Sequence, residues 1–411
     1  MSARSRRGGH GGLSGPLAVV FITVLIDLIG FGIVLPILPL WAETFGASPT
    51  EIGFLTASYS LMQVIFAPVW GRMSDRVGRR PVILITLAGS AISSLLIGLA
   101  GSLTVLFLAR IINGISGASY AAAQAYVADV TTAKDRARGM GMIGAAFGLG
   151  FILGPAIGAG LSAIDHSAPF FFAAALAAAN LVFAAVRLPE SRKPGTVAAR
   201  GSRWDALRRA LTSPALAPLI WLSFIATFGF VGMESTFALL GDRRFGYGPV
   251  AMGVLFVVVG LAAAVGQGLL VGRLVDRFGE YHVMLVGLIG TTVGLTLMSV
   301  ATNLVVMIPA LIILGSTSGL AFATVSALIS HGASDSEQGS VLGLAASTGG
   351  VARIIGPITA GFVFDAVAPG APLVLGAALT LVCLAIAVTR VPADLRLDRA
   401  GGAIAPDTRD S

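Results

Sequence analysis

Four charged residues lie inside long apolar runs of this chain, and their types indicate proton or ion chemistry. Asp27 lies within the apolar run 17–40, and Arg110 lies within another such run. Glu234 and Arg353 occupy similar positions later in the chain. A charge at the centre of a bilayer costs about 2.5 to 3.5 kcal/mol on insertion scales, so such residues usually face a polar cavity or a partner. We therefore expect these four side chains to serve function.

Asp27 has two interpretations. A protonated Asp27 that is hydrogen-bonded between helices would serve packing alone. A carboxylate with a positive neighbour would instead exchange a proton, because the neighbour favours the ionised form and burial favours the protonated form. Arg110 lies within its run rather than at an end, so its side chain has no easy route to the membrane surface. We expect Asp27, or a polar network around it, to be the partner of Arg110.

The elements that hold these residues are apolar throughout. Of 411 residues, 55% are hydrophobic and 11% are charged, whereas soluble domains carry roughly 25% charged residues. The mean hydropathy is +0.89. Apolar stretches of about 20 residues, each long enough to cross a bilayer as a helix, recur along the chain. The sequence predicts an all-α integral membrane protein with twelve transmembrane helices.

The predicted helices form two bundles of six. The expected divisions are a tail over 1–14, a bundle over 15–188, a polar linker over 189–213 with a short surface helix at 204–211, a bundle over 214–391 and a tail over 392–411. The first bundle comprises the spans 15–40, 48–71, 81–100, 103–126, 137–161 and 168–188. The second comprises 214–240, 250–274, 283–301, 304–330, 339–364 and 372–391.

The basic residues gather on one side of this topology. If the N-terminus lies inside, they fall in the cytoplasmic loops, linker and tails, and the opposite side shows Arg243 and Arg244. Both termini are therefore expected in the cytoplasm, with the chain in the inner (plasma) membrane. The formal net charge of +7 then indicates contact with an anionic leaflet and no nucleic-acid partner. The first run is too long for a cleaved signal peptide.

Hydrolytic, redox and metal chemistry have no visible constellation of residues. Cys383 is the single cysteine, which excludes an internal disulfide and offers no metal cluster. Of four histidines, His166 and His331 are expected in loops, without the spacing of a zinc site. The chain has no GxxxxGK[ST] phosphate-binding loop. We expect no enzyme activity, no cofactor and no metal.

A repeat indicates that the two bundles are equivalent. The motif GRMSDRVG over 71–78 recurs as GRLVDRFG over 272–279, an offset of 201 residues. The pair Gly154-Pro155 recurs as Gly356-Pro357, an offset of 202. The chain is therefore expected to be a duplicated six-helix unit, the arrangement of transporters whose halves rock about a central site.

These residues also carry a family resemblance. The segment GRMSDRVGRRP over 71–81 resembles the loop signature of the major facilitator superfamily, and the segments 27–36, 108–117 and 144–160 resemble its drug:proton antiporter branch with twelve transmembrane helices, which includes the tetracycline exporters. The second half matches through its repeat motif and through MESTF over 233–237. The resemblance implies the fold of that superfamily, with two pseudo-symmetric six-helix bundles and a small-molecule substrate.

The repeated loop motif is expected to act in gating. Its glycines allow tight turns, and its charges lie where helix ends meet the cytoplasm. Asp75 would form a latch if it faced the N-terminus of the span 339–364 in one conformation; the alternative is simple anchoring at the membrane surface. The resemblance adds a bond between Arg79 and Asp129. The full gating set is Gly71, Asp75, Arg76, Gly78, Arg79, Arg80, Asp129, Asp276 and Arg277.

The fifth span contains glycines at four-residue spacing. Such spacing lets two helix backbones approach closely, and a proline permits a bend. Plain helix packing explains the spacing equally well. The resemblance implies an antiporter motif that forms a sealing contact with the second half. The motif comprises Gly144, Gly148, Gly150, Gly154, Pro155 and Gly158.

A cavity between the halves is expected to be apolar with a few polar groups, which suits lipophilic compounds. Glu234 would share in proton binding or select cations, with an ion pair to Arg353 as the structural alternative. The third and ninth spans contain no acid, unlike what the resemblance leads us to expect of tetracycline exporters, so tetracycline is a doubtful substrate. The candidate lining residues are Phe31, Tyr59, Gln63, Asn113, Tyr120, Phe147, Phe151, Phe228, Phe230, Phe237 and Gln267.

The sequence therefore predicts a secondary transporter that exports small lipophilic or amphiphilic compounds in exchange for protons. The alternative is a transporter of the same fold for a sugar, metabolite or lipid, with or without proton coupling. A receptor or scaffold would not need Asp27, and a membrane enzyme would need paired acids or metal ligands. Each chain holds a complete predicted pathway, so we expect a monomer in the lipid bilayer.

Overall fold

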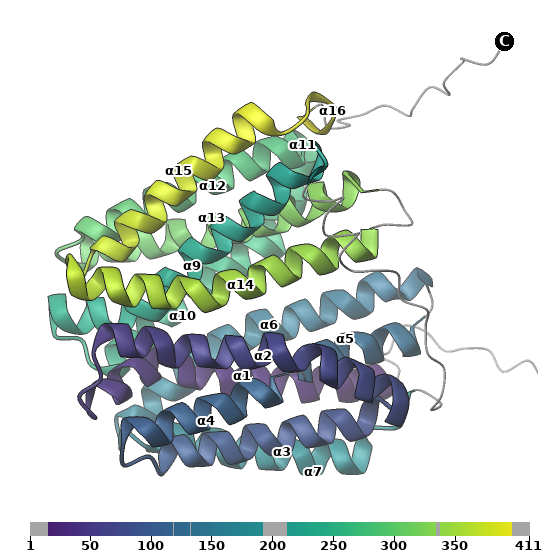
Figure 1. The fold of residues 1–411 in the computed structure, drawn as a ribbon, viewed down its shortest axis with the longest axis vertical. Coiled ribbons are helices and arrows are strands. Elements are labelled where there is room, and N and C mark those ends of the chain that lie inside the picture. Colours follow the sequence, from purple (N-terminus) through teal and green to yellow (C-terminus); the bar gives the residue numbers. More distant parts are fainter. Residues whose placement is uncertain (1–14, 118, 132, 192–211, 334–337, 397–411) are drawn as a thin grey trace, which may run out of the picture.

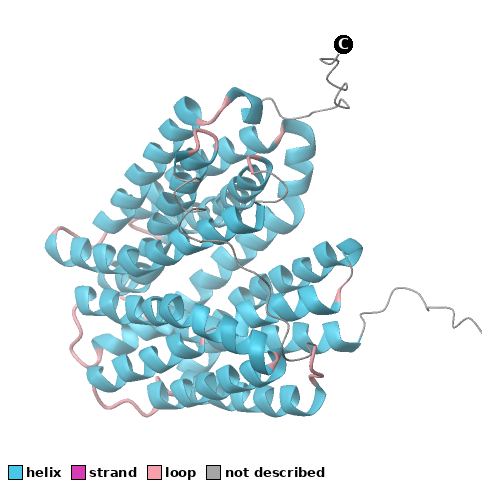
Figure 2. Cartoon of the chain, turned by 45° about the vertical axis from the view of Figure 1, so that its right-hand side comes forward, coloured by secondary structure: helices cyan, strands magenta, loops and turns pink. Residues whose placement is uncertain are grey.

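The computed structural model describes residues 15–117, 119–131, 133–191, 212–333 and 338–396. The N-terminal tail, the predicted surface helix at 204–211 and the C-terminal tail beyond 396 lie outside the described residues. Within the described ranges the chain is helical and contains no strand (Figure 2). This confirms the all-α fold class. Among the described residues, eleven helices are long and apolar enough to cross a membrane.

The described part of the first unit contains seven helices. They are α1 (Gly15–Glu43), α2 (Pro49–Val77), α3 (Arg79–Gly98), α4 (Leu103–Ser116), α5 (Ser119–Val130), α6 (Ala133–Ser162) and α7 (Ala168–Arg187). Helices α4 and α5 together occupy the fourth predicted span, which was expected to be one helix. The break falls at Gly117, where low helix propensity allows the chain to leave the helix. The carbonyl freed there accepts a hydrogen bond from Gln63 Nε2 at 2.9 Å.

The second unit repeats this order. It contains α9 (Leu216–Phe245), α10 (Pro249–Val265), the π-helical turn η1 (Gly266–Leu270), α11 (Val271–Phe278), α12 (Glu280–Val300), α13 (Leu304–His331), α14 (Gln338–Ala366), α15 (Ala371–Arg390) and the short α16 (Ala393–Arg396). Helices α10 and α11 with η1 form the eighth predicted span. His331, which was expected in a loop, is instead the last residue of α13.

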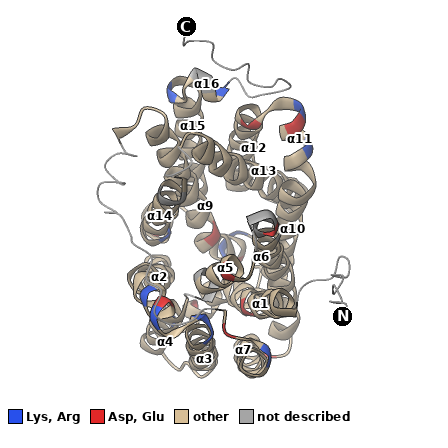
Figure 3. Ribbon diagram, turned by 90° about the vertical axis from the view of Figure 1, so that its right-hand side faces the viewer, with Lys and Arg blue, Asp and Glu red and all other residues tan. Residues whose placement is uncertain are grey.

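The two units lie side by side, with α1–α7 in the lower half of Figure 1 and α9–α16 in the upper half. Figure 3, which looks along the helices, shows them as two groups. Helix α2 packs on α14 and α6 packs on α10. Glycines make these seams close: a Cβ atom at Gly53 would lie 3.0 Å from the carbonyl carbon of Pro357, and one at Gly253 would lie 2.6 Å from Ala159 Cβ. Replacement of either glycine would therefore push the units apart.

The hydrophobic core is shared at one end of the molecule and divided at the other. We call the end with the α1–α2 and α9–α10 loops the joined end, and the opposite end the linker end. At the joined end, one cluster of buried side chains runs through both units and includes Ile37 and Phe237. At the linker end, Tyr126 belongs to a cluster of the first unit and Leu328 to a separate cluster of the second. The units are thus in contact at the joined end and hold separate cores at the linker end.

Polar contacts add to this seal at the joined end. Arg243 Nη2 lies 2.8 Å from Glu43 Oε1, which ties the end of α9 to the end of α1. The backbone N–H of Thr50 donates to Asp365 Oδ2 at 2.9 Å, and the Thr50 hydroxyl donates to the same oxygen. These contacts tie the start of α2 to the end of α14. Both pairs join the two units.

Candidate functional site

Tyr59 of α2 is the centre of a charged and aromatic cluster. Gln63 Nε2 donates to its hydroxyl at 3.3 Å, and the guanidinium carbon of Arg110 lies 4.6 Å from the centre of its ring. Such stacking of a cation on an aromatic ring is attractive, the more so when both are removed from water. The approach of α4 to α2 is possible because residue 114 is glycine: a Cβ atom there would lie 2.9 Å from Tyr59 Cα.

Arg110 has partners other than the one expected. Its side chain is buried, with 5% exposure. The interactions that the structure gives its guanidinium are with the ring of Tyr59 and, electrostatically, with Glu234 of the second unit. Its Nε atom is buried and has no hydrogen-bond partner among the described residues. Arg110 therefore contacts Tyr59 rather than Asp27, and it interacts electrostatically with an acid of the second unit.

Glu234 of α9 lies between two arginines. Its half-buried carboxylate is close enough to Arg353 of α14 and to Arg110 to interact electrostatically with both. Neither arginine places a nitrogen within 4 Å of it in the described part of the chain, so no direct ion pair forms in this conformation. The side chain of Arg353 is exposed. The interface thus holds one carboxylate and two guanidinium groups within mutual reach.

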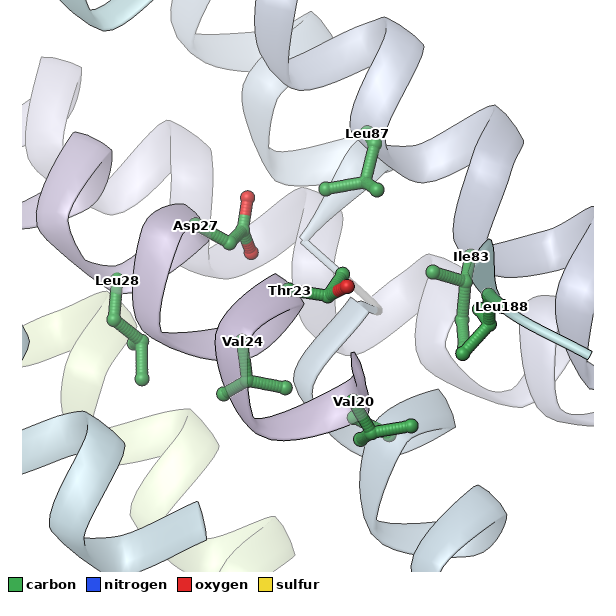
Figure 4. Close-up of a pocket in the computed structure, with 9 residues that line it drawn as sticks. Val20, Thr23, Val24, Asp27, Leu28, Ile83, Leu87 and Leu188 are labelled. Carbon is green, nitrogen blue, oxygen red and sulfur yellow. The ribbon is translucent and has the colours of Figure 1, made fainter. Parts of the chain in front are cut away.

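Asp27 lies within the first unit rather than between the units. It borders a small pocket formed by α1, α3, α5 and the residue that follows α7 (Figure 4). Tyr59 interacts electrostatically with Asp27 as well as with Arg110 and Arg353. Tyr59 is therefore linked electrostatically both to the acid of the first unit and to the charges at the interface. The pocket is lined by Val20, Thr23, Val24, Asp27, Leu28, Ile83, Leu87, Ala123 and Leu188.

The predicted lining residues divide into two groups. Phe31, Phe147 and Phe151 gather beside Tyr59: the ring centres of Phe31 and Tyr59 are 5.7 Å apart, those of Phe31 and Phe151 are 6.1 Å apart, and those of Phe147 and Phe151 are 4.6 Å apart. In the second unit the Phe230 ring meets Phe322 edge-on at 5.8 Å. These rings supply the apolar part of the site.

The other candidates lie elsewhere. Phe237 is 1% exposed and packs on Phe256 in the shared core, so in this conformation it lines no cavity, contrary to expectation. Asn113 donates to Ser93 Oγ at 2.8 Å and thereby joins α4 to α3. Phe228 lies 6.4 Å from Phe224 on the same helix, and Gln267 packs against Gly319. The side chain of Tyr120 lies outside the described residues.

The first copy of the loop motif forms an ion-pair network at the linker end. Arg79 contacts Asp75 at 2.9 Å and Asp129 at 2.9 Å, so the contact that the resemblance implied is present. Asp75 makes its ion pair within the first unit here, and its expected meeting with the N-terminus of α14 stays a prediction. Gly71, Arg76 and Arg80 flank this network on α2 and α3.

Glu190 was not identified in the sequence analysis, and it binds the start of α3 next to this ion-pair network. Its carboxylate accepts the backbone N–H groups of Arg79 at 2.8 Å and Arg80 at 3.1 Å, at the start of α3. The first N–H groups of a helix have no partner inside the helix, so an acid there is favourable. Gly78 has φ of 109° and makes the turn that α3 follows. An acid directly after the sixth span was the available signal.

The second copy of the motif is more exposed. Helix α11, which carries Asp276 and Arg277, contains no buried residue. The Arg277 guanidinium lies 5.2 Å from the Phe278 ring centre. Gly279 has φ of 78° and makes the same kind of turn as its counterpart in the first unit. The repeat therefore preserves the turn but not the burial of the charges.

Three of the five motif glycines of α6 face α1. A Cβ atom at Gly150 would lie 2.6 Å from Leu28 Cβ, and one at Gly154 would lie 2.6 Å from Gly32. One at Gly158 would lie 2.9 Å from Ile37 Cδ1, whereas Gly144 and Gly148 have no neighbour within 4 Å. Of the motif residues, Pro155 faces the second half, on the face of α6 that also carries Phe151 and Ala159. This face meets α10 at Gly253 and Gly260.

A duplicated six-helix membrane unit with charged residues at the interface defines a secondary transporter, not an enzyme. The family model of the Major Facilitator Superfamily matches residues 20–357 and 245–406. The chain belongs to this superfamily, in the branch that holds the tetracycline and multidrug resistance proteins.

The sequence relatives cover nearly the whole chain. Tetracycline resistance protein, class C, of Escherichia coli is 34% identical over 378 residues, which span 90% of this chain and 95% of the relative. Multidrug resistance protein 1 of Bacillus subtilis (strain 168) is 31% identical over 356 residues, 85% of this chain and 90% of the relative. The chain is thus similar along its length to proteins of bacterial drug resistance.

Solved structures show the same fold. The crystal structure of the human organic anion transporter MFSD10 (TETRAN) matches with a TM-score of 0.70 and 26% identity, over 91% of this chain and 99% of that chain. The nucleoside transporter NupG matches with a TM-score of 0.76 and 16% identity, over 92% and 99%. At the latter identity the likeness concerns the fold alone.

Proposed function

We propose that this chain exports small lipophilic or amphiphilic compounds in exchange for protons by alternating access. The relatives named for tetracycline and multidrug resistance support the export of drug-like compounds. The cluster around Tyr59 supports proton coupling, because Tyr59 interacts electrostatically with Asp27, Arg110 and Arg353. Glu234 interacts with the same two arginines. This cluster is the observation that carries the proposal.

The two conformations of the cycle follow from the arrangement of the cores. With both termini in the cytoplasm, the joined end faces away from the cytoplasm and is closed by the shared core and the Glu43–Arg243 contact. A substrate would then enter from the linker end. Rocking of the units would close that end, where Asp75 would meet α14, and open the joined end. The cycle needs a single chain in the plasma membrane.

The proton gradient supplies enough free energy for useful export. One proton that moves through a 100 mV potential releases about 2.3 kcal/mol. Exchanged for one neutral molecule, this sustains roughly a 50-fold concentration gradient, at about 1.4 kcal/mol for each factor of ten.

Dye efflux in inverted membrane vesicles tests the proposal. The wild-type chain should move a lipophilic cationic dye only when a proton gradient is present, and Asp27→Asn should abolish this. Asp165→Asn is the matched control, because it makes the same chemical change at an exposed loop residue. Equal dye movement by the wild type and Asp27→Asn would refute proton coupling through Asp27.

A second candidate is the transport of organic anions. The specific observation is that Arg110 and Arg353 flank the single carboxylate of Glu234, so protonation of that carboxylate would leave a positive interface. The structural relative TETRAN is named an organic anion transporter. Uptake of a lipophilic carboxylic acid into the same vesicles, compared with its uncharged methyl ester, separates the two candidates. Preference for the acid, lost in Arg353→Gln, would favour the anion.

A further inference from the structure

The pocket beside Asp27 leads along α1 toward the linker end. Its lining on α1 runs from Val20 to Asp27, two helical turns, or about 10 Å at 1.5 Å per residue. At the linker end it is closed by the apolar side chains of Val20, Ile83 and Leu188, each no more than 3% exposed. Asp27 lies at the inner end (Figure 4). The pocket therefore lies inside the first unit, where apolar side chains separate it from the linker end.

The hydroxyl group of Thr23 is directed into this pocket. Other helical threonines in the chain, such as Thr56 and Thr227, donate to the carbonyl one turn earlier at 3.0 and 2.7 Å. Thr23 Oγ1 is buried and has no hydrogen-bond partner among the described residues. Thr23 and Asp27 are one turn apart on the same face of α1, as Figure 4 shows. An unpartnered buried hydroxyl costs about 1 to 3 kcal/mol, so a partner is expected.

Asn180 of α7 holds the backbone of Thr23 in place. Its Nδ2 atom donates to the Thr23 carbonyl at 2.8 Å, and the side chain is fully buried. The free volume of the pocket is about 10 Å³, which is room for one water molecule. Such a water needs two or more polar partners, and the Thr23 hydroxyl and the Asp27 carboxyl group supply them.

We propose that this pocket holds a water molecule that carries the proton between Asp27 and the cytoplasm, with Thr23 as its positioning residue. The inference rests on the proposed function and adds a proton route to it. The Asp27 O–H bond breaks as the pocket water gains a proton, and the water passes one proton to water from the cytoplasm when Val20, Ile83 and Leu188 separate. Nothing is oxidised or reduced.

The charges around the site favour this route over the interface. A proton that left through the interface would pass Arg110 and Arg353, whose positive charges repel it. The side chains that line the pocket from α3, α5 and the end of α7 are uncharged, and the titratable group facing Asp27 from α2 is Tyr59. Proton and substrate would thus use separate paths on the cytoplasmic side.

Two substitutions of Thr23 test the proposal in vesicles. Thr23→Val keeps the side-chain shape and removes the hydroxyl, whereas Thr23→Ser keeps the hydroxyl. Proton-driven efflux should fall about tenfold or more in Thr23→Val, within the range of lost proton-transfer assistance, and recover in Thr23→Ser. Substrate exchange without net proton movement should change less than about twofold in either variant, because it needs no proton transfer.

The outcomes separate this inference from the proposed function. Unchanged proton-driven efflux in Thr23→Val would overturn it. An equal loss of exchange and efflux would also overturn it, because Thr23 would then serve the structure of the transporter and not proton transfer. A wild-type chain without proton-driven efflux would instead overturn the proposed function. The infrared carboxyl band of Asp27 in purified protein, identified by its absence in Asp27→Asn, then tests the pocket itself. It should shift in Thr23→Val and not in Thr23→Ser; an unshifted band rules out the water contact.

Discussion

The contact between α1 and α6 allows a sharp prediction, because the test residue, Gly154, and the control residue, Gly148, both lie on α6. At Gly154 of α6 a Cβ atom would lie 2.6 Å from the Cα and carbonyl carbons of Gly32 and 2.8 Å from the carbonyl oxygen of Ile29. All three neighbours are backbone atoms, which cannot rotate away. Gly154→Ala therefore forces the helices apart.

The magnitude follows from the distances. Ordinary contacts of a Cβ atom begin near 3.4 Å, so α1 must move by about 0.8 Å in an interior packed as densely as a crystal. Overpacking of this kind typically costs about 1 to 3 kcal/mol. We expect Gly154→Ala to lower the thermal unfolding temperature of the purified protein. It should also slow transport, because the displaced helix carries Asp27.

Gly148→Ala is the control. It lies in the same motif on the same helix, but a Cβ atom there would have no neighbour within 4 Å. Alanine is better than glycine in a helix interior by about 1 kcal/mol, so this variant should be as stable as the wild type or more so. Equal destabilisation by both substitutions, or none by Gly154→Ala, would refute the packing role that the structure gives this motif.

Three further predictions follow from contacts outside the site. Glu190→Gln should destabilise the protein by about 1 kcal/mol in thermal unfolding, since the start of α3 loses a negative charge; an unchanged midpoint would exclude this role. Glu43→Gln removes the charged partner of Arg243, and an exposed ion pair of this kind is worth about 1 kcal/mol at most. The equilibrium constant for opening of the joined end, measured with spin labels on the two units, should therefore rise by no more than about fivefold. Hydrogen bonds from Ser167 hold the pKa of Asp165 below its usual 3.8, so this loop gains stability above that value and loses it as the pH falls through the lower folded-state pKa. Ser167→Ala should reduce that dependence in unfolding measured against pH.

The number and order of the helices could be predicted because each span must satisfy its own backbone hydrogen bonds in lipid. Hydropathy therefore locates spans such as α1 and α9 within a few residues. The break between α4 and α5 escaped detection, because both sides of Gly117 are apolar and the break depends on a contact with Gln63 of another helix. Helix ends are less determined by the local sequence than helix existence.

The partners of the site residues could not be predicted in the same way. Asp27, Arg110 and Glu234 lie on helices α1, α4 and α9, as their predicted spans required. A sequence, however, does not state which face of a helix meets which neighbour. Arg110 thus received Asp27 as its expected partner, whereas the structure gives it Tyr59 and Glu234. The same reason explains Phe237, whose aromatic side chain fits a cavity wall and a buried core equally well.

One regularity emerges only when the repeat is compared with the structure. Arg79 at the start of α3 lies 2.9 Å from Asp129 near the end of α5, and Glu280 at the start of α12 lies 3.0 Å from His331 at the end of α13. These positions are 201 and 202 residues apart, the offsets of the repeated motifs. The two units therefore share an ion-pair position with the charges exchanged.

Because the charges are exchanged, the two ion pairs depend differently on protonation. Arg79 is charged at every physiological pH, whereas His331 is charged only when protonated. In each ion pair one residue follows a glycine with positive φ: Arg79 follows Gly78, and Glu280 follows Gly279. The backbone turn is therefore common to both units, whereas the charged residue that follows it differs. A duplicated unit keeps what the turn requires and is free to vary the pair. The structure thus assigns the permanent ion pair to the first unit, which carries Asp27, and the protonation-dependent one to the second.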